Sequence, residues 1–318
     1  MSQLYDPNTA VYLNPAVNRK VAVVTGGAGG LGWYTILHLY LHGYVVYMAA
    51  RNPAKVEKAI ADIKAEAKRR SPGPTVGKLH FVEMDLTSLQ SVKNAADTLA
   101  NKETKIDILI NNAGIMAVPY EITQDGYEIQ YQVNFVSHML LTLRLLPQLE
   151  ASPSPRVVFV TSLGHYLSYR YFEPSDTLHY WPDALWSWVR YGVAKSADIQ
   201  FTKYMAREHP RILWLSVHPG IVPGTDLAAS WTQGPASSQV FTRLNSVIAS
   251  TWGISNEQGS FSTLRAAFDP HLSAKGDNGK FLTTGGAEGS VQWVANNPDN
   301  AKRTVEYNVA QLRANGYL

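Results

Sequence analysis

Two side chains in the second half of the chain could transfer a proton together. Tyr191 and Lys195 lie four residues apart in a segment of helical period, so they project from one face of a helix. A phenol is a poor base at neutral pH, but a nearby ammonium stabilises the phenolate and so favours proton transfer. The spacing alone is common in helices and usually marks a surface pair. Two further residues favour a catalytic role for this pair: Ser162 closes a β-rich run upstream, and Asn134 lies on an earlier predicted helix.

A glycine-rich segment near the N-terminus could bind phosphate groups. Residues 25–32 read Thr-Gly-Gly-Ala-Gly-Gly-Leu-Gly, directly after a β-rich run and before a helical segment. Glycines let the chain turn tightly and bring its backbone close to a pyrophosphate, which the N-terminal end of the helix attracts. Many glycine runs are ordinary turns, but this strand-loop-helix context favours nucleotide binding. The expected contacts are Thr25, Gly26, Gly30, Leu31 and Gly32.

The end of the second predicted strand distinguishes two dinucleotides. An Asp or Glu there binds the ribose 2′-hydroxyl of NAD, whereas an Arg accommodates the additional phosphate of NADP. This chain has Arg51 and Asn52 there and no acidic residue until Glu57. Since a guanidinium suits bidentate contact with phosphate, we expect NADP(H) to be the cofactor. The alternative is that Arg51 is an exposed arginine at the start of a helix.

Together these motifs resemble the short-chain dehydrogenase/reductase family. The glycine loop has the family's spacing of Thr-Gly, three residues and Gly-x-Gly, and the chain has a matching tetrad of Asn, Ser, Tyr and Lys. The resemblance covers nearly all of the chain from about Lys20. Within the family, several blocks resemble the branch of retinol dehydrogenases and WW-domain oxidoreductases: residues 112–116, 125–128, 133–135, 161–165 and 255–259.

The resemblance implies one role for each member of the tetrad. Tyr191 donates or accepts the proton, and Ser162 orients the substrate oxygen. Lys195 also grips the nicotinamide ribose, and Asn134 holds a water molecule in the proton relay. The expected reaction is hydride transfer between NADP(H) and a carbonyl or alcohol.

The ends of later strands acquire cofactor roles from the same resemblance. Asp85 and Leu86, at the end of the third predicted strand, would contact the adenine ring. The residues at this strand end, or at the end of the fourth predicted strand, could instead be only helix-cap or turn residues. The run Asn112, Ala113 and Gly114 would line the adenosine ribose and brace the central strands.

A turn after the sixth predicted strand would lie beside the nicotinamide. It contains Pro219, Gly220 and Val222, with Thr225 as a contact to the carboxamide or phosphate. The spacing to Thr225 is longer than the family's usual one.

Alternating β-rich and helical segments predict an α/β fold, with a Rossmann-like doubly wound parallel sheet and helices on both faces. The expected strands are Val21–Thr25, Tyr44–Ala49, Lys78–Met84, Ile106–Ile110, Val157–Thr161, Ile212–Val217 and Lys280–Thr283. The expected helices begin near Gly30, Pro53, Ser88, Gly126, Ala184 and Ser255. We expect an N-terminal arm over residues 1–19 and a single domain over 20–318, with substrate-loop insertions around 163–188 and 223–252.

The first predicted insertion is rich in aromatic residues and could line a substrate pocket. We therefore favour a hydrophobic ketone, aldehyde or secondary alcohol as substrate. The alternative is that these side chains only anchor the loop. They are His165, Tyr166, Tyr169, Tyr171, Phe172, His179, Tyr180, Trp181, Trp186 and Trp188.

Composition excludes several other classes of site. The chain has no cysteine, which removes disulfides, thiolate metal ligands and cysteine nucleophiles. The histidines at 165, 179 and 218 do not have the spacing of a metal site, and we expect no metal. The net charge is only +3 and the basic residues are scattered, so we expect no nucleic-acid partner.

The compartment and the oligomeric state are expected from similar arguments. Leu31–Ala50 lacks charged residues and has the length of a membrane span, but His38 and His42 interrupt it, so a buried helix and strand explain it better. The first twenty residues lack the apolar core of a secretory signal, and we expect a cytoplasmic protein. The helix with the Tyr-Lys pair often forms a dimer face in the family, so a homodimer is possible and a monomer remains open.

Two other functions compete with the enzyme that uses NADP(H). A protein with this fold could bind the dinucleotide as a scaffold or sensor without catalysis. An NAD-dependent alcohol dehydrogenase is the other alternative, and Arg51 argues against it.

Overall fold

Seven parallel strands form one sheet in the computed structural model, which describes residues 5–70, 75–168, 173, 175–222 and 253–318. The order across the sheet is β3-β2-β1-β4-β5-β6-β7, so the chain starts in the middle and winds outward in both directions. This arrangement confirms the predicted Rossmann-like α/β fold. The strands are β1 (Val21–Thr25), β2 (Val45–Ala50), β3 (Lys78–Glu83), β4 (Ile108–Asn111), β5 (Arg156–Val160), β6 (Leu213–Val217) and β7 (Phe281–Leu282).

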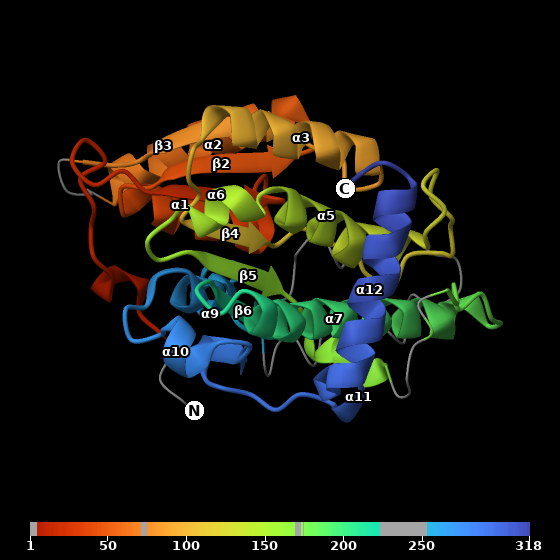
Figure 1. Cartoon of the computed structure of the whole chain (residues 1–318). Coiled ribbons are helices and arrows are strands. Elements are labelled where there is room, and N and C mark those ends of the chain that lie inside the picture. The colour runs from red at the N-terminus through yellow and green to blue at the C-terminus, as the bar shows by residue number, and fades with distance from the viewer. Residues whose placement is uncertain (1–4, 71–74, 169–172, 174, 223–252) are drawn as a thin grey trace.

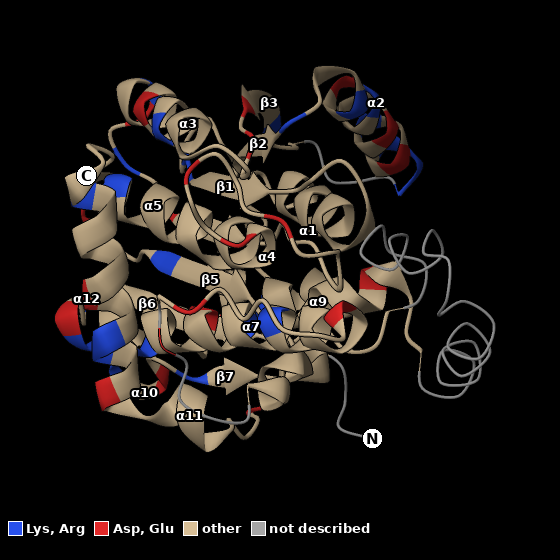
Figure 2. Ribbon diagram, turned by 90° about the vertical axis from the view of Figure 1, so that its right-hand side faces the viewer, with Lys and Arg blue, Asp and Glu red and all other residues tan. Residues whose placement is uncertain are grey.

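Helices cover both faces of the sheet (Figures 1 and 2). One face carries α1 (Gly30–Leu41), α2 (Pro53–Arg69) and α9 (Asn256–Phe268). The other carries α3 (Leu89–Lys102), α5 (Ser137–Arg144), α7 (Asp183–Glu208) and α12 (Pro298–Ala314). The shorter helices are α4 (Ile129–Tyr131), α6 (Leu146–Glu150), α10 (Ala274–Asp277) and α11 (Trp293–Asn296).

The central strands are apolar on both sides because each side faces a core. Val21 and Val23 of β1 pack with the α3, α5 and α7 side, whereas Ala22 and Val24 pack with α1, α2 and α9. All four are completely buried. A parallel strand covered on both faces needs such an uninterrupted apolar run, and the charge-free sequence of β1 provides it.

The predicted strands agree with the observed ones to within two residues at each end. The predicted helix near Gly126 begins later, because Gly126 lies in a turn with a φ angle of 84°. Glu128 then accepts a hydrogen bond from the backbone N–H of Tyr131 and so caps α4. The helix α7 begins at Asp183, so the last residues of the first predicted insertion belong to that helix. The second insertion, 223–252, lies outside the described residues.

The C-terminal helix α12 packs across α7 (Figure 1). Thr304 of α12 donates a hydrogen bond to Gln200 of α7 at 2.7 Å. No helix was predicted after the one that begins near Ser255, and the composition of the buried side of α12 explains this omission. This side includes the polar residues Asn300, Thr304 and Asn308, which interrupt the apolar stripe. This helix covers part of α7, the helix considered for a dimer face.

The N-terminal residues that the structure describes pack against the rest of the chain. The backbone N–H of Leu13 donates to the carbonyl of His42 at 3.0 Å. Arg19 donates to the buried carboxylate of Glu103 at 2.7 Å. These contacts fix residues 5–19 beside the sheet.

The uncharged run Leu31–Ala50 forms most of α1 and all of β2, as predicted. Most of its side chains are buried: those of α1, Val46 and Met48 lie on the side of α9 and α2, whereas Val45, Tyr47 and Ala49 face the core on the α3 side. Among the residues that the structure describes, none of the helices is both long and apolar enough to cross a membrane.

Candidate active site

The glycine segment forms the turn from β1 into α1. Gly26 and Gly30 have φ angles of 73° and 55°, a region that glycine adopts without strain. A Cβ atom on Gly32 would lie only 2.3 Å from the backbone oxygen of Gly26, so α1 can begin this close to the loop only with glycine. The N-cap residue Gly29 supplies no side-chain hydrogen bond to the first turn of α1. Backbone N–H groups of that turn can therefore bind an anion.

Thr25, a predicted cofactor contact, acts through its buried side chain as a brace. Its Oγ1 accepts hydrogen bonds from the backbone N–H groups of Asn112 and Ala113, both at 2.9 Å. The side-chain amide of Asn112 donates to the carbonyl of Thr25 at 2.8 Å. A Cβ atom on Gly26 would collide with Ala113 at 2.8 Å. The loops after β1 and β4 are thus locked together.

The turn after β6 lies next to the start of α1. Leu31 and Val222 both border Gly259 of α9, where a Cβ atom would lie 2.6 Å from a methyl carbon of each. Gly220 has a φ angle of 99°, which allows the tight turn after Pro219. The structure therefore brings these predicted contacts to one edge of the sheet. Thr225 lies outside the described residues.

The predicted adenosine contacts occupy the ends of β2 and β3. Arg51 is exposed, and no ion pair between described residues includes it. Asn52 caps α2 by accepting a hydrogen bond from the backbone N–H of Lys55 at 3.0 Å. Oδ1 of Asp85 accepts two hydrogen bonds from the turn that follows it, and the side chain of Leu86 is buried. Among these residues Arg51 alone is exposed and charged, and so best suited to a phosphate.

Tyr191 and Ser162 approach each other across Gly164. A Cβ atom on Gly164 would lie 2.7 Å from Cε1 of Tyr191 and 3.3 Å from Oγ of Ser162. Ser162 follows β5, and its Oγ accepts a hydrogen bond from the backbone N–H of Gly164 at 3.0 Å. Glycine at 164 therefore lets the phenol ring and the hydroxyl share one side of the site.

Asn134 and Lys195 meet beside Gly114 in the same way. A Cβ atom there would lie 2.7 Å from Oδ1 of Asn134 and 3.8 Å from Nζ of Lys195. Asn134 lies in a π-helical turn, residues 132–136, and its amide bonds to both the N–H and the carbonyl of Ile115, each at 2.9 Å. Such turns are frequent at functional sites. With Nζ of Lys195 6.0 Å from the centre of the Tyr191 ring, the structure brings the four predicted side chains into one region.

The ammonium of Lys195 has two partners that were not among the predicted site residues. Nζ donates to the carbonyl of Val160 at 2.9 Å and lies 3.2 Å from Oδ2 of Asp198. Burial raises the pKa of Asp198 to about 7, against the opposing effect of Lys195. A carboxyl three residues after a helical lysine is a signal that helical spacing offers in advance.

Two buried histidines near the site are held neutral. Burial lowers the pKa of His138 to about 4, and it lowers the pKa of His218 to about 4 as well. Nδ1 of His138 lies 2.9 Å from the carbonyl of Asn134. His138 was not among the predicted site residues, although it lies four residues after Asn134 and therefore on the same helix face.

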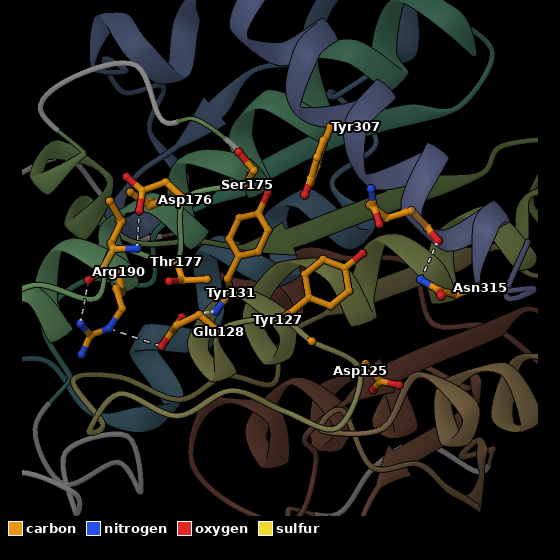
Figure 3. Close-up of a pocket in the computed structure, with 14 residues that line it drawn as sticks. Asp125, Tyr127, Glu128, Tyr131, Ser175, Asp176, Thr177, Arg190, Tyr307 and Asn315 are labelled. Atoms are coloured by element: carbon orange, nitrogen blue, oxygen red, sulfur yellow. Dashed lines mark hydrogen bonds and ion pairs between the residues drawn. The ribbon is translucent and has the colours of Figure 1, made fainter.

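A cavity of about 210 Å³ lies on another side of α7 (Figure 3). Arg190 and Glu128 line it, both almost completely buried, with Nε of the arginine 3.5 Å from Oε1 of the carboxylate. Burial raises the pKa of Glu128. At 100° per residue, Arg190 and Val193 point well away from the face that holds Tyr191. The ion pair therefore anchors the helix turn that carries Tyr191 without entering the region where the four predicted side chains meet.

The aromatic residues of the first insertion divide into packed and exposed groups. His179 stacks on Tyr120, with ring centres 3.8 Å apart, and Trp186 packs on Tyr180 at 4.7 Å. Trp181 is 90% exposed. The predicted residues 169–172 lie outside the described residues. Part of the set therefore anchors the loop.

The residues present fit a nicotinamide dinucleotide. The start of α1 offers backbone N–H groups without a side-chain cap, close backbone approach is enforced by glycine, and an exposed arginine follows β2. All three lie at the carboxyl ends of the strands, where parallel sheets bind ligands.

Comparison with known proteins agrees with this arrangement. A family profile described as short chain dehydrogenase matches residues 20–171. The short-chain dehydrogenase/reductase drtF of Aspergillus calidoustus is 34% identical over 319 residues, covering 94% of this chain and 95% of that protein. Retinol dehydrogenase 12 of Mus musculus is 34% identical over 66% of this chain and 63% of its own length. A solved structure of a Mycobacterium paratuberculosis protein is 25% identical, covers 98% of each chain and has a TM-score of 0.70.

Fold, site geometry and relatives thus lead to one family. Its members are oxidoreductases that use nicotinamide cofactors. The relatives confirm the resemblance to the retinol dehydrogenase branch. The chain belongs to the short-chain dehydrogenase/reductase family.

Proposed function

We propose that this protein is an NADP(H)-dependent oxidoreductase that interconverts a hydrophobic ketone or aldehyde and the corresponding alcohol. The observation that carries the proposal is the convergence of Asn134, Ser162, Tyr191 and Lys195 around Gly114 and Gly164. The convergence favours an enzyme over a scaffold, because a protein that only binds the dinucleotide does not need a phenol, a hydroxyl and an ammonium close together in one site.

Each side chain has one step in the proposed reaction. The bound nicotinamide supplies or accepts the hydride. In reduction, Tyr191 transfers its phenolic proton to the carbonyl oxygen as that oxygen gains negative charge. Ser162 donates a hydrogen bond to the same oxygen and holds it near the phenol. The ammonium of Lys195 stabilises the phenolate that remains.

Asn134 has a fixed position in this scheme. Its amide is bonded to the backbone of Ile115 at both ends, which holds the loop after Gly114 against the π-helical turn. In the proposed site this fixes the loop at Gly114, beside the ammonium of Lys195, where a water in the proton relay would bind.

The preference for NADP(H) rests on Arg51. The side chain is exposed at the end of β2, where a dinucleotide's adenosine ribose would lie, and Asn52 is engaged as the cap of α2. The phosphate groups would be held by Gly26, Gly30, Leu31 and the first turn of α1. Asp85, Asn112, Ala113, Gly114, Pro219, Gly220, Val222 and Thr225 are the remaining proposed contacts.

The hydrophobic substrate rests on the aromatic side chains that follow Ser162. Exposed Tyr166 and Leu167 project from the turn after β5, on the same segment as Gly164. Such a wall favours an apolar carbonyl compound over a sugar or an amino acid.

Titration with NADPH and NADH, followed by addition of hydrophobic ketones and aldehydes, tests the proposal. Tighter binding of NADPH and carbonyl-dependent loss of its nicotinamide absorbance support it. Tight binding without turnover across a broad panel favours the scaffold, and tighter binding of NADH favours the NAD-dependent alternative.

The organisation of the molecule adds three proposals. Residues 20–318 form a single domain, residues 1–19 form an N-terminal arm, of which the described part from Tyr5 packs against that domain, and the protein is located in the cytoplasm. A homodimer would have to use a surface other than the part of α7 that α12 covers. Light scattering during gel filtration distinguishes a monomer from a dimer.

A further inference from the structure

The structure contains a buried carboxylate beside the proposed catalytic lysine that the tetrad does not include. Asp198 lies three residues after Lys195 on α7, and its Oδ2 is 3.2 Å from Nζ. Both side chains are shielded from solvent, with exposures of 1% and 5%. A carboxylate this deeply buried costs several kcal/mol of solvation unless a positive charge accompanies it, so its place in the fold needs an explanation.

Asp198 is incompletely satisfied by the fold itself. Its Oδ1 is buried and has no hydrogen-bond partner among the described residues. Lys195 is the one charged group of the described chain that acts on it, and burial raises its pKa to about 7. A residue kept only for packing would be better served by an apolar side chain of the same size.

The other titratable groups around Lys195 are neutral or are part of the proposed machinery. His138 on α5 feels the charge of Lys195 and stays uncharged, because burial lowers its pKa to about 4. His165, in the turn after β5 that packs on α7, has its pKa lowered by burial as well. Tyr191 lies on the same helix face. Asp198 is therefore the group that balances the lysine charge.

We infer that Asp198 is a positioning residue for the proposed reaction: its carboxylate holds the Lys195 ammonium near the end of β5 and opposes part of its charge at Tyr191. The inference rests on the proposed function. Two N–H groups of the ammonium are taken by Val160 and Asp198, which leaves one for the ribose or for a water in the relay. The carboxylate makes the phenolate less stable than it would be beside an unopposed lysine, so it sets the pH range of proton transfer.

The test compares wild type with Asp198→Asn, which keeps the shape and an acceptor for Lys195. Asp198→Ser is a second variant in case the first folds poorly, and Asp107→Asn is a matched control. Asp107 is also buried but supports β1 by accepting from the backbone N–H of Val21. The first readout is the midpoint of the pH profile of kcat/KM for alcohol oxidation. This midpoint should fall by about one pH unit in the Asp198 variants, because the phenolate is then more stable, and it should stay unchanged in Asp107→Asn. An unchanged midpoint in an active Asp198 variant overturns the inference.

A second readout does not depend on catalysis. The raised pKa of Asp198 means that wild type loses stability relative to Asp198→Asn as pH rises from about 4 to about 7. The Tm of Asp198→Asn minus that of wild type should therefore grow over this range, and more so when Lys195→Met is added to both chains. A constant difference overturns the inference. Failure of the wild type to turn over any carbonyl would overturn the proposed function, while the thermal comparison would still show whether Asp198 is a buried charge paired with Lys195.

Discussion

Oγ1 of Thr25 lies 2.9 Å from Nε2 of His138, and this contact joins the end of β1 to the helix that follows Asn134. The same Oγ1 accepts hydrogen bonds from the loop after β4. Its single proton must therefore go to the imidazole, which makes His138 a neutral ring with its proton on Nδ1. That proton is donated to the carbonyl of Asn134. The end of β1 and the backbone of Asn134 are thus connected by one buried chain of hydrogen bonds.

The first prediction is that Thr25→Val destabilises the protein by about 3 kcal/mol, because it leaves two buried N–H groups and the imidazole nitrogen without partners. Affinity for NADPH should fall with it. The matched control is Thr35→Val, where one buried hydroxyl donates to the carbonyl of Leu31. It should cost about 1 kcal/mol. Urea unfolding measures both, and equal losses would show that the network adds nothing.

The second prediction concerns the ion pair that anchors α7. Arg190→Met leaves the buried carboxylate of Glu128 without a positive charge, and we expect a loss of about 3–5 kcal/mol in the free energy of unfolding. Adding Glu128→Gln to that variant should recover part of the loss. Lys58→Met breaks an exposed pair with Asp62 and should cost less than about 1 kcal/mol. Denaturant unfolding of wild type, the two single variants and the double variant measures these losses. A small effect of Arg190→Met would show that the ion pair does not anchor α7.

The third prediction tests cofactor choice. Arg51→Ala should weaken NADPH binding about 10- to 100-fold, since a charged hydrogen bond contributes about 1.5–3 kcal/mol, and should leave NADH binding almost unchanged. Arg69→Ala, at the other end of α2 and about 25 Å away, is the control. Fluorescence titration of wild type and both variants with NADPH and with NADH measures the six affinities. An Arg51→Ala protein that kept its affinity for NADPH would leave NAD as the better assignment.

The fourth prediction is a pH dependence of stability. Burial lowers the pKa of His218 from 6.5 to about 4. The unfolded chain therefore binds a proton near pH 6.5 that the folded chain refuses until about pH 4. The contribution of the neutral ring is present above pH 6.5 and lost as pH falls toward 4. The unfolding free energy of wild type minus that of His218→Asn should fall by about 3 kcal/mol between pH 7 and 4, and a flat difference would contradict the buried neutral state.

The sheet and the cofactor loop were predictable because their signals are local. An apolar run followed by glycines and a helix, as in residues 21–41, has one good structural solution. The start of α4 was missed because Gly126 looks like a helix start, whereas its positive φ angle and the cap at Glu128 belong to a turn. The polar inner face of α12 hid that helix, since its burial depends on partners such as Gln200 that are far away in the sequence.

The tetrad could be named from motifs, but its supporting residues could not. Helical spacing places Asp198 beside Lys195 and His138 beside Asn134, yet neither belongs to a motif, and their burial and the contact of His138 with Thr25 depend on the fold. Thr25 differs from these two residues, because a motif named it but did not predict the structural role of its side chain. The motif assigned it to the cofactor, and the fold uses its side chain to join β1 to β4.

The most direct test of the central claim is the rate of carbonyl-dependent NADPH oxidation by wild type and by Tyr191→Phe, with NADPH affinity measured on both. We expect NADPH binding to be unchanged within about twofold and the rate to fall by a factor of at least about 100, since in the proposed reaction the phenol supplies the transferred proton. Equal rates in the two proteins would contradict the claim, because the Tyr191 hydroxyl would then have no part in the chemistry.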